Sequence, residues 1–185
     1  MSNLLVTPTR IPEVLVLEPK VFGDERGWFY ESFNAAQFLA ATGIQAEFVQ
    51  DNQSFSKKNT LRGLHYQVEK TQGKLVRVTA GAVFDVAVDL RQSSAHFGKW
   101  VGAELSAQNH RQMWIPAGFA HGFFVLSDAA EFLYKTTDYY YPQGERCLAW
   151  NDPTVGVVWP IPEGIEPTMN AKDLTGFAWN QAPKF

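Results

Sequence analysis

Alternating apolar and polar residues recur along the chain in short runs, which predicts a protein built mainly from β-strands. In the N-terminal part such runs lie at 14–22, with a break at Pro19, at 27–33 and at 47–55, and a polar loop is expected at 56–60. One stretch favours a helix instead. "NAAQFLAATG" is rich in Ala and Leu inside, with Asn34 at the N-cap position and Gly43 at the C-cap position.

The strand pattern is densest in the middle of the chain. "KLVRVTAGAVFDVAVDL" (74–90) predicts two strands joined at Gly81, and period two places on one face Phe84, Val86, Val88 and Leu90. Four more strand-like stretches follow: "GKWVGAEL", "RQMWIPAG", "HGFFVLSD" and "AEFLYKTTDYYY", with turn residues at Asn109, Gly118 and Asp128. Such spacing indicates an antiparallel sandwich or small barrel. The Pro- and Gly-rich tail from Trp159 is expected to wrap the outside.

Composition and charge narrow the class of protein. The chain has 185 residues and no repeat or linker, so we expect one domain over 1–185 with its own core. A net charge of −3 without basic or acidic blocks argues against nucleic acid or a membrane surface as partner. The single cysteine, Cys147, precludes an intrachain disulfide and is expected in the core. With no signal-peptide pattern and no long apolar run, a cytoplasmic protein is expected.

Two of the four histidines lie in apolar, aromatic surroundings and are candidate functional groups. His65 belongs to "LRGLHYQ" (61–67) and His121 to "PAGFAHGF" (116–123), whereas His96 and His110 lie in polar stretches and are expected on the surface. The flanking residues alone leave the structural and the functional interpretation of His65 and His121 equally open.

A metal site is the first alternative for two such histidines. "PAGFAHGF" resembles the second half-motif of the cupins, in which the histidine is a metal ligand. The first half-motif has two histidines one residue apart, but "HYQVE" has Gln67 in place of the second. Glutamine is a poor ligand for zinc or iron, and two histidines lack the usual third side chain. The sequence therefore disfavours a metal-dependent cupin oxygenase and predicts a site without a metal.

The remaining polar residues suit proton abstraction next to a carbonyl group, a reaction that needs no cofactor. His65 would be the base, and Tyr134 a proton donor on the opposite side, provided that a nearby cation or dipole lowers its pKa. Arg62 and Lys74 would stabilise an enolate or a phosphate. Tyr134 as a sheet aromatic and Lys74 as a solvated lysine remain open alternatives. Gly63 is expected to let a bulky ligand approach the strand closely.

Ten fragments in order extend this interpretation: "FGDERGWFYESF", "FVQDNQS", "LRGLHYQ", "QGKLVRV", "FDVAVDLR", "FGKWVGAELSA", "RQMWIPAGFAHGF", "EFLYKTTDYY", "WNDPTVGVVWP" and "AKD". Together, from about Leu17 to Asp173, they resemble the dTDP-4-dehydrorhamnose 3,5-epimerase family. The resemblance implies a cupin-like jelly-roll barrel (a double-stranded β-helix) with a few short helices, and a homodimer that exchanges N-terminal strands. It also implies a cofactor-free epimerisation at C3 and C5 of dTDP-4-dehydro-6-deoxy-D-glucose, giving dTDP-4-dehydro-L-rhamnose in dTDP-L-rhamnose biosynthesis.

The resemblance also implies roles for individual residues. His65 would be the base, Tyr134 the proton donor, Lys74 a catalytic cation and Asp173 the carboxylate that orients His65, with Asp85 as a rival. Substrate-binding positions would be Arg26, Glu31, Gln50, Asn52, Arg62, His121, Tyr139, Glu145 and Lys172. Tyr139 or Tyr140 would stack on thymine, and Tyr141 makes that choice ambiguous. The segment "LTGFAWNQAPKF" is more aromatic than the resemblance leads us to expect, which leaves its role over the site open.

Two other functions remain open on the sequence alone. A relative of the same fold would epimerise only C3 or only C5, or would move the carbonyl as a ketoisomerase. A non-catalytic cupin would bind a sugar nucleotide without reacting, but the joint presence of His65, Tyr134 and Lys74 argues against it.

Overall fold

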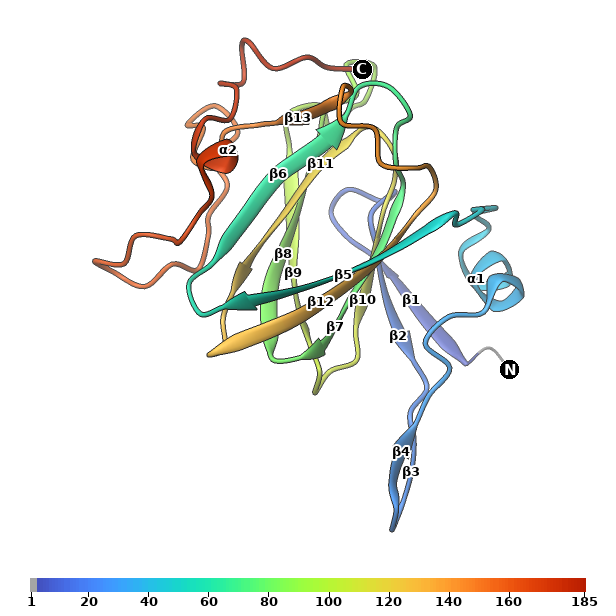
Figure 1. Cartoon of the computed structure of the whole chain (residues 1–185). Helices are drawn as coiled ribbons and strands as arrows, with labels where there is room; N and C mark the ends of the chain where they lie inside the picture. The colour runs from blue at the N-terminus through green and yellow to red at the C-terminus, as the bar shows by residue number, and fades with distance from the viewer. Residues whose placement is uncertain (1–2) are drawn as a thin grey trace.

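The computed structural model describes residues 3–185, in which two antiparallel sheets pack into a barrel and a third sheet is a two-stranded hairpin (Figure 1). Met1 and Ser2, the first residues of the predicted domain, lie outside this range. One sheet has the order β1-β2-β10-β7-β12-β5, with β1 Leu4–Pro8, β2 Leu15–Pro19, β10 Gln112–Ile115, β7 Lys74–Ala80, β12 Ala129–Thr136 and β5 Gln50–Lys57. The other has the order β13-β6-β11-β8-β9, with β13 Glu145–Cys147, β6 Leu61–Gln67, β11 Phe119–Val125, β8 Ala82–Asp89 and β9 Trp100–Ser106. This is the predicted, mainly β, jelly-roll architecture.

The predicted helix is confirmed, whereas two predicted boundaries were wrong. Helix α1 (Ala35–Thr42) begins after Asn34, whose side chain accepts a hydrogen bond from the Gln37 N–H, and ends at Gly43 in the left-handed conformation. The strand expected at 27–33 is only β4 (Gly27–Phe29), because its ladder partner within the described part of the chain is β3 (Phe22–Asp24), which has three residues. The loop expected at 56–60 begins later, because β5 pairs with β12 as far as Lys57.

Strand β8 is buried on both faces, and the two faces contact different parts of the molecule. Val83 and Ala87 pack between the two sheets. The predicted stripe lies on the outer face, where it packs against residues of the C-terminal tail, including Trp159 and Trp179. The tail therefore wraps the outside of the barrel, as predicted, and Figure 1 shows it beside β6 and β13. Because strand residues alternate between faces, Asp85 lies on the interior side of β8.

A β-bulge in β6 determines where its polar residues lie. In the pairing of β6 with β11, His65 is opposite His121 and Arg62 is opposite Phe123, so one extra residue is present in β6. Gly63 has φ +114°, and a Cβ atom there would lie 2.6 Å from the His121 carbonyl oxygen and 2.7 Å from the Gly122 Cα. The expectation that Gly63 makes room for a ligand was therefore wrong, because the closely approaching group is strand β11.

The hairpin of β3 and β4 extends away from the barrel, as Figure 1 shows at the bottom of the view. Its large apolar side chains are exposed, namely Phe22, Trp28 and Phe29. His110 packs its ring against Trp28 and Tyr30, with centroid distances of 4.8 and 4.9 Å, so this expected surface histidine is partly covered. Among residues 3–185, no helix has both the length and the apolar character needed to cross a bilayer.

Candidate active site

A cavity of about 410 Å³ lies between the two sheets and collects most of the predicted site residues. Those that line it are Gln50, Asn52, Arg62, His65, Lys74, His121, Tyr134 and Glu145. The bulge at Gly63 explains why Arg62 and His65, three positions apart in a strand, both point to the same cavity. The two sheets thus contribute opposite walls, with His65 on β6 and Tyr134 on β12.

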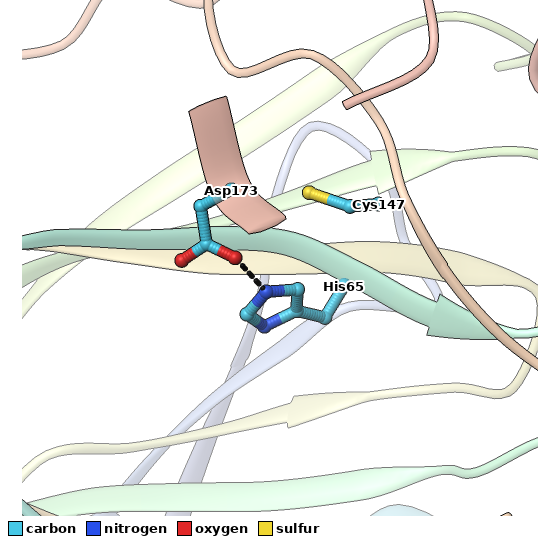
Figure 2. Close-up of side chains that lie close together, drawn as sticks. All are labelled: His65, Cys147 and Asp173. Atoms are coloured by element: carbon cyan, nitrogen blue, oxygen red, sulfur yellow. Dashed lines mark hydrogen bonds and ion pairs between the residues drawn. The ribbon is translucent and has the colours of Figure 1, made fainter. Parts of the chain in front are cut away.

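His65 forms a hydrogen-bonded pair with Asp173 (Figure 2). The distance from His65 Nε2 to Asp173 Oδ1 is 2.5 Å, and Asp173 Oδ2 accepts the backbone N–H of Gly63 at 3.3 Å. Asp173 is only 1% exposed and belongs to the short helix α2 (Ala171–Leu174), whose N-cap Asn170 accepts the Asp173 N–H. A carboxylate on Nε2 fixes the tautomer and leaves Nδ1 as the ring nitrogen without a partner in residues 3–185.

Asp85, the rival for this place, pairs with the other histidine of the cavity, His121. His121 Nε2 lies 2.9 Å from Asp85 Oδ2, and both side chains are buried on neighbouring strands. Burial raises the pKa of Asp85 and lowers the pKa of His121, although each group opposes the shift of the other. Each of the two histidines that line the cavity therefore has its own aspartate partner, and Asp173 is the partner of His65.

Among residues 3–185, one group could hold a metal ion: His65, Asp173 and Cys147, whose ligand atoms lie within 4.8 Å of one another (Figure 2). Two ligands of one tetrahedral zinc lie about 3.3 Å apart, so the 2.5 Å contact of His65 with Asp173 would have to open. Burial is the main cause that raises the pKa of Cys147 to about 12, and the charge of Asp173 is the next largest. The thiol therefore stays protonated near neutral pH, whereas metal binding needs the thiolate. This arrangement fits a hydrogen-bonded pair beside a core cysteine better than a metal centre.

Lys74 lies at the start of β7 with its side chain buried in the cavity wall. Burial lowers its pKa to about 8, although the charges of Asp85 and Glu145 oppose this shift. Its Nζ is 3.4 Å from the backbone carbonyl oxygen of His65. The alternative of a solvated lysine is therefore wrong, and the ammonium is placed to contact an anion inside the cavity.

Tyr134 lines the cavity from the opposite sheet, and its pKa differs from the expected direction. Burial raises the pKa and the charge of Glu145 raises it further, which together outweigh the lowering effect of Arg62. The expected cation does not prevail because the lowering effect of the Arg62 charge is smaller than either the effect of burial or that of Glu145. The Tyr134 phenol therefore stays protonated near neutral pH, as a proton donor requires.

A hydrogen-bonded cluster at one wall joins three further residues. Tyr140 donates to Glu145 Oε2 at 2.6 Å, and Lys172 Nζ pairs with the same oxygen. Burial would raise the pKa of Glu145, but Lys172 and Tyr140 outweigh it and hold this pKa below its ordinary value. Since Lys172 precedes Asp173 in α2, the cluster ties the cavity wall to the helix that carries the His65 partner.

Five predicted residues do not line the cavity of this chain. Asp173 and Lys172 pair with the lining residues His65 and Glu145, and the other three are Arg26, Glu31 and Tyr139. Arg26 is at the tip of the β3–β4 hairpin, where its side chain is 85% exposed and pairs with Asp24. Glu31 lies beyond that hairpin beside α1. Of the tyrosines, Tyr140 lines the cavity and Tyr139 does not, because the Tyr139 carbonyl is bound by Gln67 while its side chain remains exposed. Tyr140, the other tyrosine considered for stacking on thymine, is therefore the one that lies at the cavity, and its stacking role stays a prediction.

Sequence reasoning missed what Gln67 and Gln72 do. Both line the cavity, and both bind the backbone of the segment that contains the tyrosines. The only signal was the presence of Gln67 where a metal-binding cupin has a histidine. That signal indicates the loss of a metal ligand, but it does not indicate the hydrogen bonds that the glutamine makes instead.

A jelly-roll barrel with a histidine–aspartate pair and a tyrosine on opposite cavity walls defines a cupin-like protein equipped for acid–base chemistry. A family model described as dTDP-4-dehydrorhamnose 3,5-epimerase matches residues 8–181. The chain belongs to this family, whose members are isomerases.

Individual relatives extend the comparison. The dTDP-4-dehydrorhamnose 3,5-epimerase of Pseudomonas aeruginosa is 57% identical over 179 residues, which cover 97% of this chain and 98% of the relative. A dTDP-6-deoxy-D-glucose-3,5-epimerase from Legionella pneumophila, solved with dTDP-4-keto-L-rhamnose, is 52% identical with a TM-score of 0.92, covering 96% and 93% of the two chains. A 3′-monoepimerase from Streptomyces bikiniensis, solved with dTDP-quinovose, is 30% identical with a TM-score of 0.87, covering 94% and 87%.

Proposed function

We propose that the protein inverts C3 and C5 of dTDP-4-dehydro-6-deoxy-D-glucose to give dTDP-4-dehydro-L-rhamnose, without a metal or cofactor, in dTDP-L-rhamnose biosynthesis. The observation that carries this proposal is the placement of the His65–Asp173 pair and Tyr134 on opposite walls of one cavity. Inversion at a carbon requires removal of a proton from one face and its return from the other. The identity to double epimerases over nearly the whole chain supports the same assignment.

The proton balance can be written for each carbon in turn. His65 Nδ1 takes the proton from C3 or C5, and the electron pair of that C–H bond moves towards C4, so that the C4 ketone oxygen becomes an enolate. Asp173 stabilises the imidazolium, and the Lys74 ammonium stabilises the enolate oxygen. Tyr134 then gives its proton to the opposite face of the carbon. Exchange with water returns the proton of Tyr134 and removes that of His65, which resets the site.

Other cavity residues support binding of a sugar nucleotide. Asn52 Nδ2 is buried without a hydrogen-bond partner in residues 3–185, so it is available as a donor to the substrate. Arg62 adds a guanidinium suited to the diphosphate, and Tyr140 presents a half-exposed ring for the base. His121, Gln50, Glu145 and Lys172 complete the proposed binding set around the same cavity and its wall.

The proposed dimer would bring in the two residues that lie far from the cavity. Arg26 and Glu31 belong to residues 22–31, the β3–β4 hairpin and the two residues after it, which we call the extended N-terminal arm and which exposes Phe22, Trp28 and Phe29. Three large apolar side chains on a thin hairpin favour burial against another subunit. In this arrangement the arm of one subunit reaches the cavity of its partner, and Arg26 supplies a cation there.

A single epimerisation is the second candidate function, because the Streptomyces bikiniensis 3′-monoepimerase shares the fold at 30% identity. The barrel by itself therefore does not determine how many carbons react.

The decisive experiment incubates the protein with dTDP-4-dehydro-6-deoxy-D-glucose in deuterated water and follows C3 and C5 by NMR. We expect deuterium at both carbons, and His65→Ala should lose exchange at both by at least about a hundredfold while it retains dTDP binding. Added chelator should leave the rate unchanged. Label at one carbon would support the monoepimerase, absence of label would contradict catalysis, and normal exchange in His65→Ala would contradict the assigned base.

A further inference from the structure

The backbone of residues 138–141 is held by glutamine side chains rather than by strand pairing. This segment follows β12, and it belongs to no strand ladder among residues 3–185. Gln72 Nε2 donates to the Asp138 carbonyl at 2.9 Å, and Gln67 Nε2 donates to the Tyr139 carbonyl at 3.2 Å. The Tyr140 N–H donates to Gln50 Oε1 and the Tyr141 N–H donates to Gln67 Oε1, both at 2.9 Å.

Gln67 is the central member of this glutamine clamp (Gln50, Gln67 and Gln72). Its side chain is buried at 5% exposure, and its Nε2 also donates to the Lys70 carbonyl at 2.7 Å. An amide has two N–H donors and one carbonyl acceptor, so all three groups of Gln67 are engaged within the protein. Gln67 lines the cavity, but it has no unused donor for a ligand, which makes a direct contact with substrate secondary to its role in the clamp.

The clamp fixes the position of one exposed aromatic ring at the cavity. Tyr140 is 52% exposed, lines the cavity and is anchored at its hydroxyl by Glu145. The Tyr140 ring has little freedom to move, because the backbone is held at residues 138–141 and the Tyr140 hydroxyl is held by Glu145. A ring ordered before binding offers a stacking face to a planar base without the entropic cost of ordering a loop.

We propose that Gln67, with Gln72, is a positioning residue for nucleotide binding, acting through the pre-ordered Tyr140. This inference rests on the proposed dTDP-sugar substrate, which supplies the base. In the cupin motif the position of Gln67 holds a metal ligand. Here the Gln67 side chain does not bind an ion but orders the wall of the nucleotide-binding cavity. Because the reacting carbons lie at the sugar end, loss of the clamp weakens binding and leaves the proton transfers intact.

Gln67→Met tests the proposal, because methionine has a similar length and makes none of the three hydrogen bonds. We expect the Kd of dTDP by titration calorimetry, and the KM of the keto-sugar, to rise about tenfold while kcat changes less than about twofold. Gln143→Met is the matched control, since Gln143 lies in the same loop, is exposed and makes no side-chain hydrogen bond within residues 3–185. That control should bind dTDP as the parent protein does.

A double-mutant cycle separates positioning from general damage. In a Tyr140→Ala background, Gln67→Met should raise the Kd of dTDP by less than about twofold, because its target is gone. An undiminished effect in that background, or a fall of kcat at unchanged KM, overturns the proposal. If Gln67→Met does not fold, Gln72→Met removes a single bond of the clamp and should give the same split between KM and kcat. Failure of the parent protein to exchange deuterium would instead refute the proposed function, independently of the dTDP titrations.

Discussion

At the scale of single residues, Lys74 shows how burial sets the pKa of a side chain. Its ammonium lies in the wall of the cavity, where burial lowers the pKa to about 8 and the charges of Asp85 and Glu145 keep it from falling further. A group with a pKa of about 8 is mostly protonated at neutral pH and loses its proton as the pH rises slightly above neutral. In the proposed reaction the charged form is the useful one, because it stabilises the enolate oxygen.

The pKa of Lys74 predicts an alkaline limb in the pH profile. As pH rises through about 8, the ammonium loses its proton and its positive charge, so kcat/KM, which reports the free enzyme, should fall. Tyr134 does not produce this limb, because burial raises its pKa above the ordinary value and keeps it protonated in that range. Steady-state rates measured between pH 6.5 and about 9.5 give the profile.

Lys74→Met supplies the comparison. Its residual kcat/KM should be lower at neutral pH and nearly flat across pH 8. An alkaline limb of unchanged midpoint in this variant would show that another group titrates there.

The sequence predicted which residues belong to the candidate site better than it predicted which of them pair with one another. The flanks of His65 and the ordered motifs around Tyr134 and Lys74 indicated the residues that line the cavity. The choice between Asp173 and Asp85 depended on how the C-terminal tail folds back over β6, a contact between residues 108 positions apart. The pKa direction of Tyr134 was equally inaccessible, because it follows from burial between the sheets.

At the scale of elements, the bulge in β6 connects the backbone to the site. Gly63 carries the extra residue, its N–H donates to Asp173 Oδ2, and its missing side chain admits the backbone of β11. Gly122 mirrors this contact, since a Cβ atom there would lie 2.5 Å from the Arg62 carbonyl oxygen. Two glycines thus let β6 and β11 approach closely, and His65 and His121 stand on these two strands.

Gly63→Ala should destabilise the protein by about 1–3 kcal/mol, because the added Cβ meets backbone that has no room to move. Thermal unfolding measures this loss. Gly164→Ala is the control, since Gly164 also has positive φ but a Cβ atom there would have no neighbour within 4 Å among the described residues. A comparable loss in both variants would mean that conformation, and not the contact with β11, accounts for the effect.

Elements with local signals were predictable, and elements defined by distant partners were not. The caps of α1 lie within the helix sequence, and the apolar stripe of β8 follows from period two. The end of β4 and the extension of β5 to Lys57 depend on which strand lies alongside. The bulge could not be predicted either, because the extra residue in β6 is defined only by its register with β11.

At the scale of the whole molecule, the barrel contains the acid–base residues but not every cation of the proposed site. Arg26 lies on the extended arm, with no contact to the cavity of its own chain in the described range. The proposed exchange of arms resolves this separation, because each site then combines the barrel of one subunit with the arm of the other.

Mixing two defective variants tests that arrangement. His65→Ala removes the base of its own barrel, and Arg26→Ala removes a cation from the arm that it gives to its partner. If the arms are exchanged, a mixed dimer has one site with both defects and one site with neither. Equal random mixing makes half of the dimers mixed, so activity at low substrate concentration should return to about a quarter of the parent level. Recovery must grow with the time allowed for subunit exchange, measured by a mass tag. Without recovery in verified mixed dimers, Arg26 does not act in the site of the partner subunit.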